Sequence, residues 1–183
     1  MKRLAGIASF CLVTFCVIGA DPIPQPQNFT HRVTGLFSPD READLRAALQ
    51  AIPDVKLVHL DFEHAEAVFS YDPAVAFNGV KAEGIVERFN EMLRRASHHS
   101  MGIAPLDTTP KAKLTPIEIP VTGLDCKACS LAAYEMIYKI DGVAAATASF
   151  KQGRVTALID TNRTDRSALE AALKKRGVTV GTP

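Results

Sequence analysis

An internal repeat at a spacing of 88 residues constrains the fold more than any other feature of the sequence. The tetrapeptide Val-Thr-Gly-Leu occurs at 33–36 and again at 121–124, and the two copies then align without a gap as far as Asp72 and Asp160. Since only two copies of this long unit exist, the repeat indicates a duplicated domain rather than a solenoid.

The register between the two copies changes once. Leu-Arg-Arg at 93–95 matches Leu-Lys-Lys at 173–175 at a spacing of 80, so the first copy carries eight extra residues, around 73–84. Before this change in register, several apolar residues of the first copy align with identical residues of the second, as in the pairs Ile52/Ile140, Val55/Val143 and Phe62/Phe150.

The second copy predicts the order strand, helix, strand, strand, helix, strand. Alternating apolar side chains indicate strands, and apolar side chains that recur at three and four residues indicate helices. The predicted elements are a strand at 117–121, a helix at 130–140, strands at 143–150 and 154–159 joined by a hairpin at 151–153, a helix capped by Thr164-Asp165 and ended by Gly177, and a strand at 178–180. This order predicts an α+β fold of two tandem ferredoxin-like βαββαβ sandwiches with antiparallel sheets.

The length of the chain agrees with this organisation, because 183 residues have room for two small domains. We expect a leader at 1–20, a degenerate first domain at 28–106, a linker at 107–114 within the Pro-rich stretch 105–116, and a second domain at 115–183. The formal net charge is only +1, and no basic stripe with interleaved aromatic residues is present. Nucleic acid is therefore not an expected partner.

The first twenty residues are typical of a secretory signal peptide. Met-Lys-Arg begins the chain, an uncharged and mostly apolar stretch follows at 4–19, and Gly19-Ala20 precedes a Pro-rich run. The alternative is a retained membrane anchor, but the apolar stretch is at the short end for one. We therefore expect an exported protein, periplasmic or extracellular.

The cysteines divide into two pairs. Cys11 and Cys16 lie in the predicted leader, and Phe15 before Cys16 disfavours lipid attachment, which prefers a small residue there. Cys126 and Cys129 remain, where a predicted strand ends and a helix begins. The positive end of the helix dipole favours thiolate at this position, and thiolate binds soft ions such as Cu(I), Hg(II) and Zn(II).

The second copy resembles the heavy-metal-associated (HMA) domain family, whose motif is roughly Gly-Met-Thr-Cys-x-x-Cys. Here the motif stands as Gly-Leu-Asp-Cys-Lys-Ala-Cys at 123–129, and the resemblance covers 115–180. It implies a non-catalytic metal-binding protein that holds one soft ion through Cys126 and Cys129, with Cu(I) or Hg(II) ahead of Zn(II). It also implies a metal-transporting membrane protein or another HMA domain as partner.

The motif departs from the family pattern at two positions. Leu124 replaces the usual Met and keeps an apolar anchor for the loop. Asp125 replaces Thr, and its charge either opposes thiolate formation or attracts a cation. By the same resemblance, the loop with Lys175 and Arg176 approaches the thiolates, where these cations would offset negative charge.

In the first copy, Ser38 and Arg41 stand where the two cysteines stand in the second. Neither is a thiol, and arginine stays protonated, so this copy is expected to serve stability or partner contact. A weaker hypothesis places a metal site at His98 and His99, in the loop before its last strand.

The remaining histidines are expected in structural positions. His31 falls on the strand face that matches Ile119, which predicts partial burial, and His59 and His64 fall at exposed strand or turn positions.

Two other function classes stay open. Cys-x-x-Cys at a strand-to-helix junction also occurs in thiol–disulfide oxidoreductases, although the expected Trp before the first cysteine and the longer thioredoxin core are lacking here. Alternatively, the two copies are adaptor modules and the cysteines form a structural disulfide.

Overall fold

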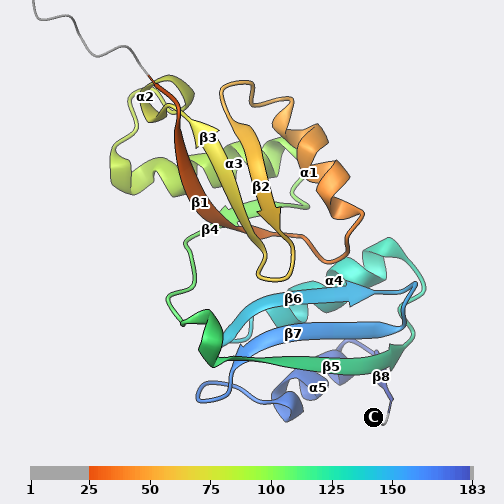
Figure 1. The fold of residues 1–183 in the computed structure, drawn as a ribbon. Coiled ribbons are helices and arrows are strands. Elements are labelled where there is room, and N and C mark those ends of the chain that lie inside the picture. The colour runs from red at the N-terminus through yellow and green to blue at the C-terminus, as the bar shows by residue number, and fades with distance from the viewer. Residues whose placement is uncertain (1–24, 182–183) are drawn as a thin grey trace, which may run out of the picture.

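The computed structural model describes residues 25–181 as two four-stranded sheets, one above the other (Figure 1). The predicted leader at 1–20, with Cys11 and Cys16, lies outside the described residues. In the part of the chain that the structure describes, no helix is both long and apolar enough to cross a membrane.

The first domain has the predicted order of elements plus an insertion. Its elements are β1 (Gln27–Thr34), α1 (Arg41–Leu49), β2 (Lys56–Asp61), β3 (Glu66–Tyr71), α2 (Pro73–Ala76), the 3-10 turn η1 (Ala82–Gly84), α3 (Ile85–Ala96) and β4 (Gly102–Ala104). The insertion consists of α2 and η1, which together occupy the segment where the repeat predicts extra residues.

The second domain has the same order without the insertion. After the 3-10 turn η2 (Lys111–Lys113), its elements are β5 (Leu114–Thr122), α4 (Lys127–Tyr138), β6 (Val143–Ser149), β7 (Arg154–Asp160), α5 (Arg166–Lys175) and β8 (Thr179–Val180). Two predicted starts differ by three residues. The first helix begins at Lys127 rather than at 130, because Cys126 caps it, and β5 begins at Leu114 rather than at 117 and includes Pro116.

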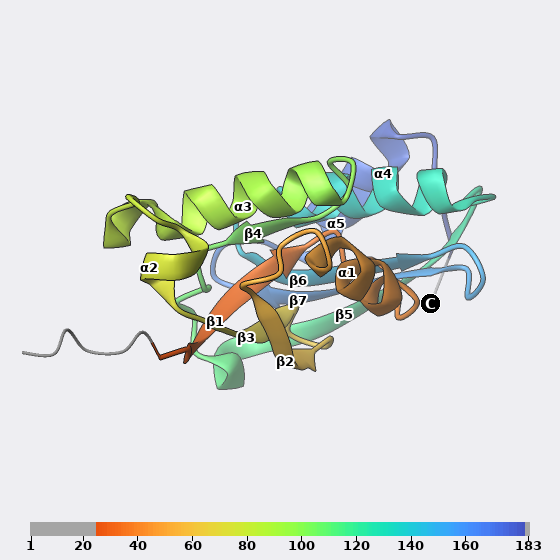
Figure 2. The same ribbon diagram turned by 90° about the horizontal axis from the view of Figure 1, so that it is seen from above.

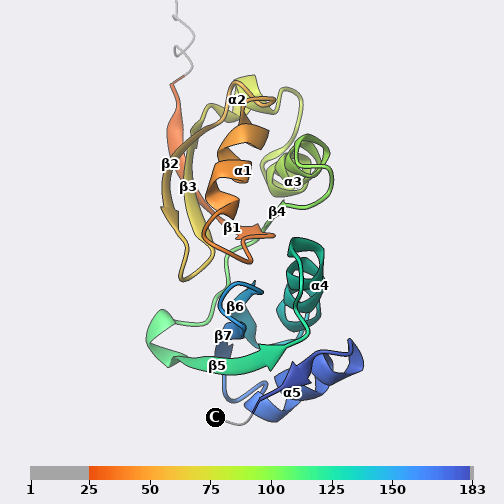
Figure 3. The same ribbon diagram turned by 90° about the vertical axis from the view of Figure 1, so that its right-hand side faces the viewer.

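Both sheets are antiparallel and have one topology. The strand orders are β2-β3-β1-β4 and β6-β7-β5-β8, which are the same permutation. Helices α1 and α3 cover one face of the first sheet, and α4 and α5 cover the corresponding face of the second, with α3 and α4 on the same side of the molecule (Figures 2 and 3). The prediction of two ferredoxin-like α+β sandwiches in tandem is confirmed.

Each domain has its own apolar core, built largely from positions that the repeat aligns. The buried pairs at a spacing of 88 residues include Val33/Val121, Leu36/Leu124, Leu49/Ile137, Val55/Val143, Ala67/Val155 and Tyr71/Ile159. The duplicated pattern of apolar residues therefore corresponds to one duplicated packing arrangement.

The turn before the first helix is also duplicated. Gly35 has φ +88° and Gly123 has φ +87°, a left-handed conformation that suits glycine and that side chains rarely adopt. In the first domain a Cβ on Gly35 would also clash with the backbone carbonyl oxygen of Ser100. The glycine of each Val-Thr-Gly-Leu segment is thus required by the backbone.

Candidate metal centre

The two thiols lie together at the start of α4. Cys126 is the N-cap residue, and its sulfur accepts a hydrogen bond from the backbone N–H of Cys129 at 3.2 Å. The two Sγ atoms are 2.7 Å apart. Cys126 is exposed, Cys129 is half-buried, and both are free cysteines. The sequence therefore places two solvent-accessible sulfurs on one loop, as expected.

A buried leucine fixes the loop that carries the thiols. Leu124 is 5% exposed and belongs to the core of the second domain, so it anchors the loop as the usual Met would. At the other end of the loop Ser130 is fully buried, and its hydroxyl accepts a hydrogen bond from the backbone N–H of Phe150 at 3.1 Å. Sequence reasoning missed Ser130, whose only signal is a polar residue directly after Cys129.

The pKa values of the two thiols are shifted in opposite directions. Hydrogen bonds from the Cys129 side chain and backbone lower the pKa of the Cys126 thiol, whereas the pKa of the Cys129 thiol is raised because it donates to Cys126 and is partly desolvated. The charge of Asp125 raises the pKa of Cys126, but this is the smallest of the effects. Hydrogen bonding therefore outweighs the charge of Asp125 in its effect on the pKa of Cys126.

An arginine stands beside the site on one side. A hollow of about 280 Å³ next to the thiols is lined by Gly123, Leu124, Ala128, Cys129, Ala132, Arg176 and Val178. Arg176 is the only charged residue of this lining. It directly follows α5, so the loop after that helix does approach the thiol loop.

The matching loop of the first domain is filled by an arginine side chain. Arg41 is 8% exposed, and its guanidinium donates hydrogen bonds to the carbonyl oxygen of Gly35 at 3.2 Å and to Oγ of Ser100 at 2.9 Å. It also pairs with Asp44 and lies 5.1 Å from the ring centroid of Phe37. The guanidinium, a permanent cation, thus joins the turn before α1 to the turn before β4.

His98 and His99 are not assembled into a site. Both are exposed, with φ values of 51° and 62°, in the turn before β4. Within residues 25–181, no three or more His, Cys, Asp or Glu side chains are grouped so that they could hold a metal ion. The described residues therefore offer the thiol pair as the donor set.

The other histidines have structural surroundings. His31 is 7% exposed, and its Nε2 lies 2.8 Å from the hydroxyl oxygen of Tyr71. Burial lowers the pKa of His31. His59 is exposed on β2, while His64 is only half-buried and pairs with Asp61 at 2.9 Å.

No protein-family model matches the chain, and neither does any curated protein. Among solved structures, the chain is similar to one described as "CopZ metallochaperone", with 25% identity over 37% of this chain and 100% of that chain and a TM-score of 0.36. The N-terminal domain of a potential copper-translocating P-type ATPase from Bacillus subtilis, in the Cu(I)-loaded state, has 28% identity over 37% of this chain and 84% of that chain, at a TM-score of 0.35. The N-terminal soluble domains of Bacillus subtilis CopA have 19% identity over 86% of this chain and 94% of that chain, also at 0.35.

Proposed function

We propose that this protein is an exported metal-binding protein, of the metallochaperone or metal-scavenging type, that holds one soft ion between Cys126 and Cys129. The single observation that supports it most is the pair of sulfurs 2.7 Å apart, exposed at a helix N-terminus. Thiolates are the ligands that soft ions prefer, and the hydrogen bonds at Cys126 favour its thiolate. Solved proteins similar to this chain include one described as a metallochaperone and one in a Cu(I)-loaded state.

Two sulfur donors suit Cu(I) or Hg(II) better than Zn(II). Zinc in proteins almost always takes four ligands, and the thiol loop supplies two. Two bonds of about 2.3 Å arranged nearly in line require a wider separation of the sulfurs than 2.7 Å, so the side chains must turn apart on loading. Their exposure permits this. It also leaves one side of the ion open to thiols of a partner, such as a metal-transporting membrane protein or another HMA domain, which allows transfer by ligand exchange.

Anaerobic titration of the reduced protein with Cu(I), Hg(II) and Zn(II) tests this proposal. We expect one Cu(I) or Hg(II) ion per chain, weaker binding of Zn(II), and loss of the site in the double variant Cys126→Ser, Cys129→Ser. The variant His98→Ala, His99→Ala is the matched control and should bind as the wild type does. Equal binding by the double serine variant would refute the assignment.

A second candidate function has one observation in its favour. The lowered pKa of Cys126 and the raised pKa of Cys129 are the asymmetry that a redox-active pair requires. Cys126 thiolate would attack a substrate disulfide, and Cys129 would then displace the substrate dithiol and leave a Cys126–Cys129 disulfide. Reduction of insulin by dithiothreitol separates the two functions: metal-free protein that accelerates it strongly would favour the redox function, and inactive protein would favour metal binding.

A further inference from the structure

The thiol loop lies at a junction between the two domains. The loop of the first domain that matches it runs from Gly35 to Arg41, and this loop packs on the second domain. The side chain of Phe37 belongs to the core of the second domain, and its carbonyl oxygen accepts a hydrogen bond from the backbone N–H of Ala148 at 2.8 Å. The backbone N–H of Gly35 donates to the hydroxyl of Tyr134 at 2.9 Å. The first loop is therefore held against the second domain at both of these points.

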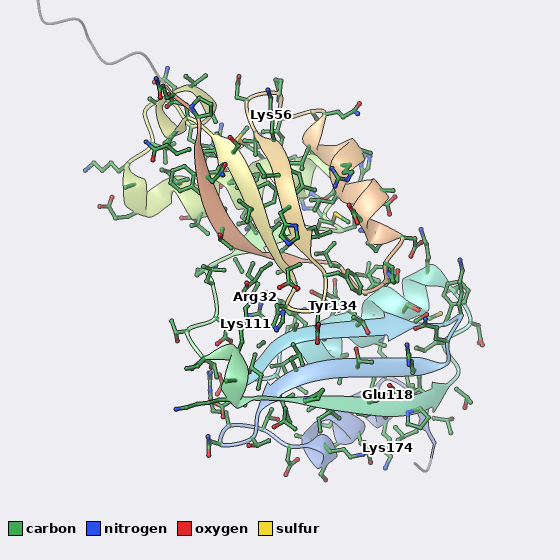
Figure 4. The ribbon with its side chains drawn as sticks, viewed as in Figure 1. Arg32, Lys56, Lys111, Glu118, Tyr134 and Lys174 are labelled. Carbon is green, nitrogen blue, oxygen red and sulfur yellow. The ribbon has the colours of Figure 1, made fainter. Side chains whose placement is uncertain are left out.

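Arg32 adds a third point of attachment from β1. Its guanidinium donates to the carbonyl oxygen of Val143 at 2.9 Å and lies 4.7 Å from the ring centroid of Tyr138. Figure 4 shows Arg32 and Tyr134 between the two sheets, with Lys111 close by on the connection. Lys111 pairs with Glu66 at 2.8 Å, so the connection is tied to the first domain as well.

This docking brings Asp40 and Asp44 of the first domain close to Lys127, one of the two residues between the cysteines. The ammonium of Lys127 lies 2.9 Å from a carboxylate oxygen of Asp40 and 3.9 Å from one of Asp44. Asp44 also pairs with Arg41, whereas the other partner of Asp40 is the hydroxyl of Ser38, which donates to it at 2.5 Å. Lys127 is the first residue of α4 and directly follows Cys126. Asp40 is thus in contact with the residue that directly follows Cys126.

The orientation of Asp40 is unusual for its place in the fold. Asp40 is the N-cap residue of α1, but its side chain makes no capping hydrogen bond. The other two N-cap aspartates do cap their helices: Asp72 accepts from the backbone N–H of Ala74, and Asp165 accepts from that of Ala168, both at 2.8 Å. The backbone of Asp40 is helical (φ −66°, ψ −14°), whereas Asp72 and Asp165 are extended, so the carboxylate of Asp40 does not cap α1 and is free to pair with Lys127.

We infer that Asp40 is a specificity-determining positioning residue for the metal centre, which weakens the binding of a monovalent ion relative to a divalent one by holding Lys127. This inference rests on the proposed function. Two thiolates with Cu(I) carry one net negative charge, whereas two thiolates with Hg(II) are neutral. The positive charge of Lys127 stabilises the negatively charged Cu(I) complex. By pairing with Lys127, Asp40 weakens this stabilisation, and its carboxylate adds a negative charge nearby. Comparing the two ions removes any dependence on the protonation of the metal-free thiols, which is common to both.

The size of the effect follows from exposure. The side chains of Lys127 and Asp40 are 56% and 47% exposed, so the ion pair is screened by solvent. Exposed pairs contribute about 0.2–1 kcal/mol, which corresponds to a factor of about 1.5 to 5 in an equilibrium constant. Asp40 remains ionised at any working pH, because Ser38 and Lys127 lower its pKa to about 2.

The test compares the affinities of the reduced protein for Cu(I) and Hg(II), each measured by competition with a chelator of known affinity. We expect Asp40→Asn to raise the Cu(I)/Hg(II) affinity ratio about 1.5- to five-fold, Asp40→Glu to keep the wild-type ratio, and Lys127→Met to lower it. Glu42→Gln on α1 and Lys139→Met on α4 are matched controls, since both residues pair within their own helices. Added salt should reduce the shift.

An unchanged ratio in both Asp40→Asn and Lys127→Met would overturn the inference, as would an equal shift in the Glu42→Gln control. These results would leave the proposed function intact if the wild type binds one ion through its thiols. A wild type that binds neither ion would instead refute the proposed function, and the inference with it.

Discussion

The two domains have the same fold, but the loop before their first helix has opposite roles in the two copies. In the second domain the loop exposes two thiols at a helix N-terminus. In the first domain the guanidinium of Arg41 fills the same place and is hydrogen-bonded on several sides. The loop of one copy is open with two free thiols, and the loop of the other is closed by the side chain of Arg41.

The residues through which the first loop packs on the second domain also differ between the two copies. Phe37 aligns with Asp125 in the repeat, so an apolar side chain that enters the neighbouring core in the first copy is replaced by an exposed acid in the second. Tyr134, which receives the first loop, aligns with Arg46. The two substitutions place an apolar side chain and a hydroxyl donor/acceptor where the first loop packs on the second domain.

The largest expected effect comes from removing the built-in cation. Arg41→Ala leaves Asp44 and the carbonyl oxygen of Gly35 without their buried partner, and hydrogen bonds to charged groups contribute about 1.5–3 kcal/mol. We expect the free energy of unfolding, measured by urea denaturation with far-UV circular dichroism, to fall by about 2–3 kcal/mol.

The equivalent change in the second copy, Cys126→Ser with Cys129→Ser, should alter that free energy by less than about 0.5 kcal/mol, because the thiols are accessible and serine is a favoured N-cap. Equal losses in the two variants would show that the loops do not differ as described.

A second contrast is acid sensitivity, because His31 in the first core aligns with Ile119 in the second. Burial lowers the pKa of His31 below 6.5, so the unfolded chain binds a proton more readily than the folded domain does. The first domain should lose stability as the pH falls below 6.5, by at most about 1.4 kcal/mol per pH unit.

Amide hydrogen exchange at pH 7 and pH 5 resolves this effect by domain. His31→Ile should abolish the contribution of this residue to the pH dependence of the first domain. If the pH dependence is the same in the variant and the wild type, another group is responsible.

A smaller effect is expected at the junction itself. Tyr134→Phe removes the acceptor for the backbone N–H of Gly35, and the unmade hydrogen bond should cost about 1 kcal/mol. Tyr138→Phe keeps the ring next to Arg32 and is the matched control. Faster amide exchange at Gly35 in Tyr134→Phe alone would support the docked arrangement, and no difference between the two variants would contradict it.

Much of this structure is predictable from the sequence because it depends on local patterns. The repeat, the alternation of apolar residues in strands and the capping signals predict both sandwiches and the insertion after Asp72. The sequence places the start of α4 three residues too far along the chain. Cysteine is a rare N-cap, and no Ser, Thr, Asp or Asn stands at position 126 to mark the start of the helix. The interface residues have a signal in the repeat: Phe37 and Tyr134 differ in polarity from their repeat partners Asp125 and Arg46, whereas most aligned core positions are apolar in both copies.

By itself, the sequence determined that the chain forms two related α+β units and that one of them carries two thiols at the start of a helix. Periodicity, turn residues and spacing act within a few residues along the chain, and they suffice for that. Only the tertiary structure decided that Arg41 fills the first loop, that the first loop docks on the second domain, and that Asp40 reaches Lys127. These contacts join residues far apart in the chain, and they depend on how two folded bodies pack together, which no local pattern encodes.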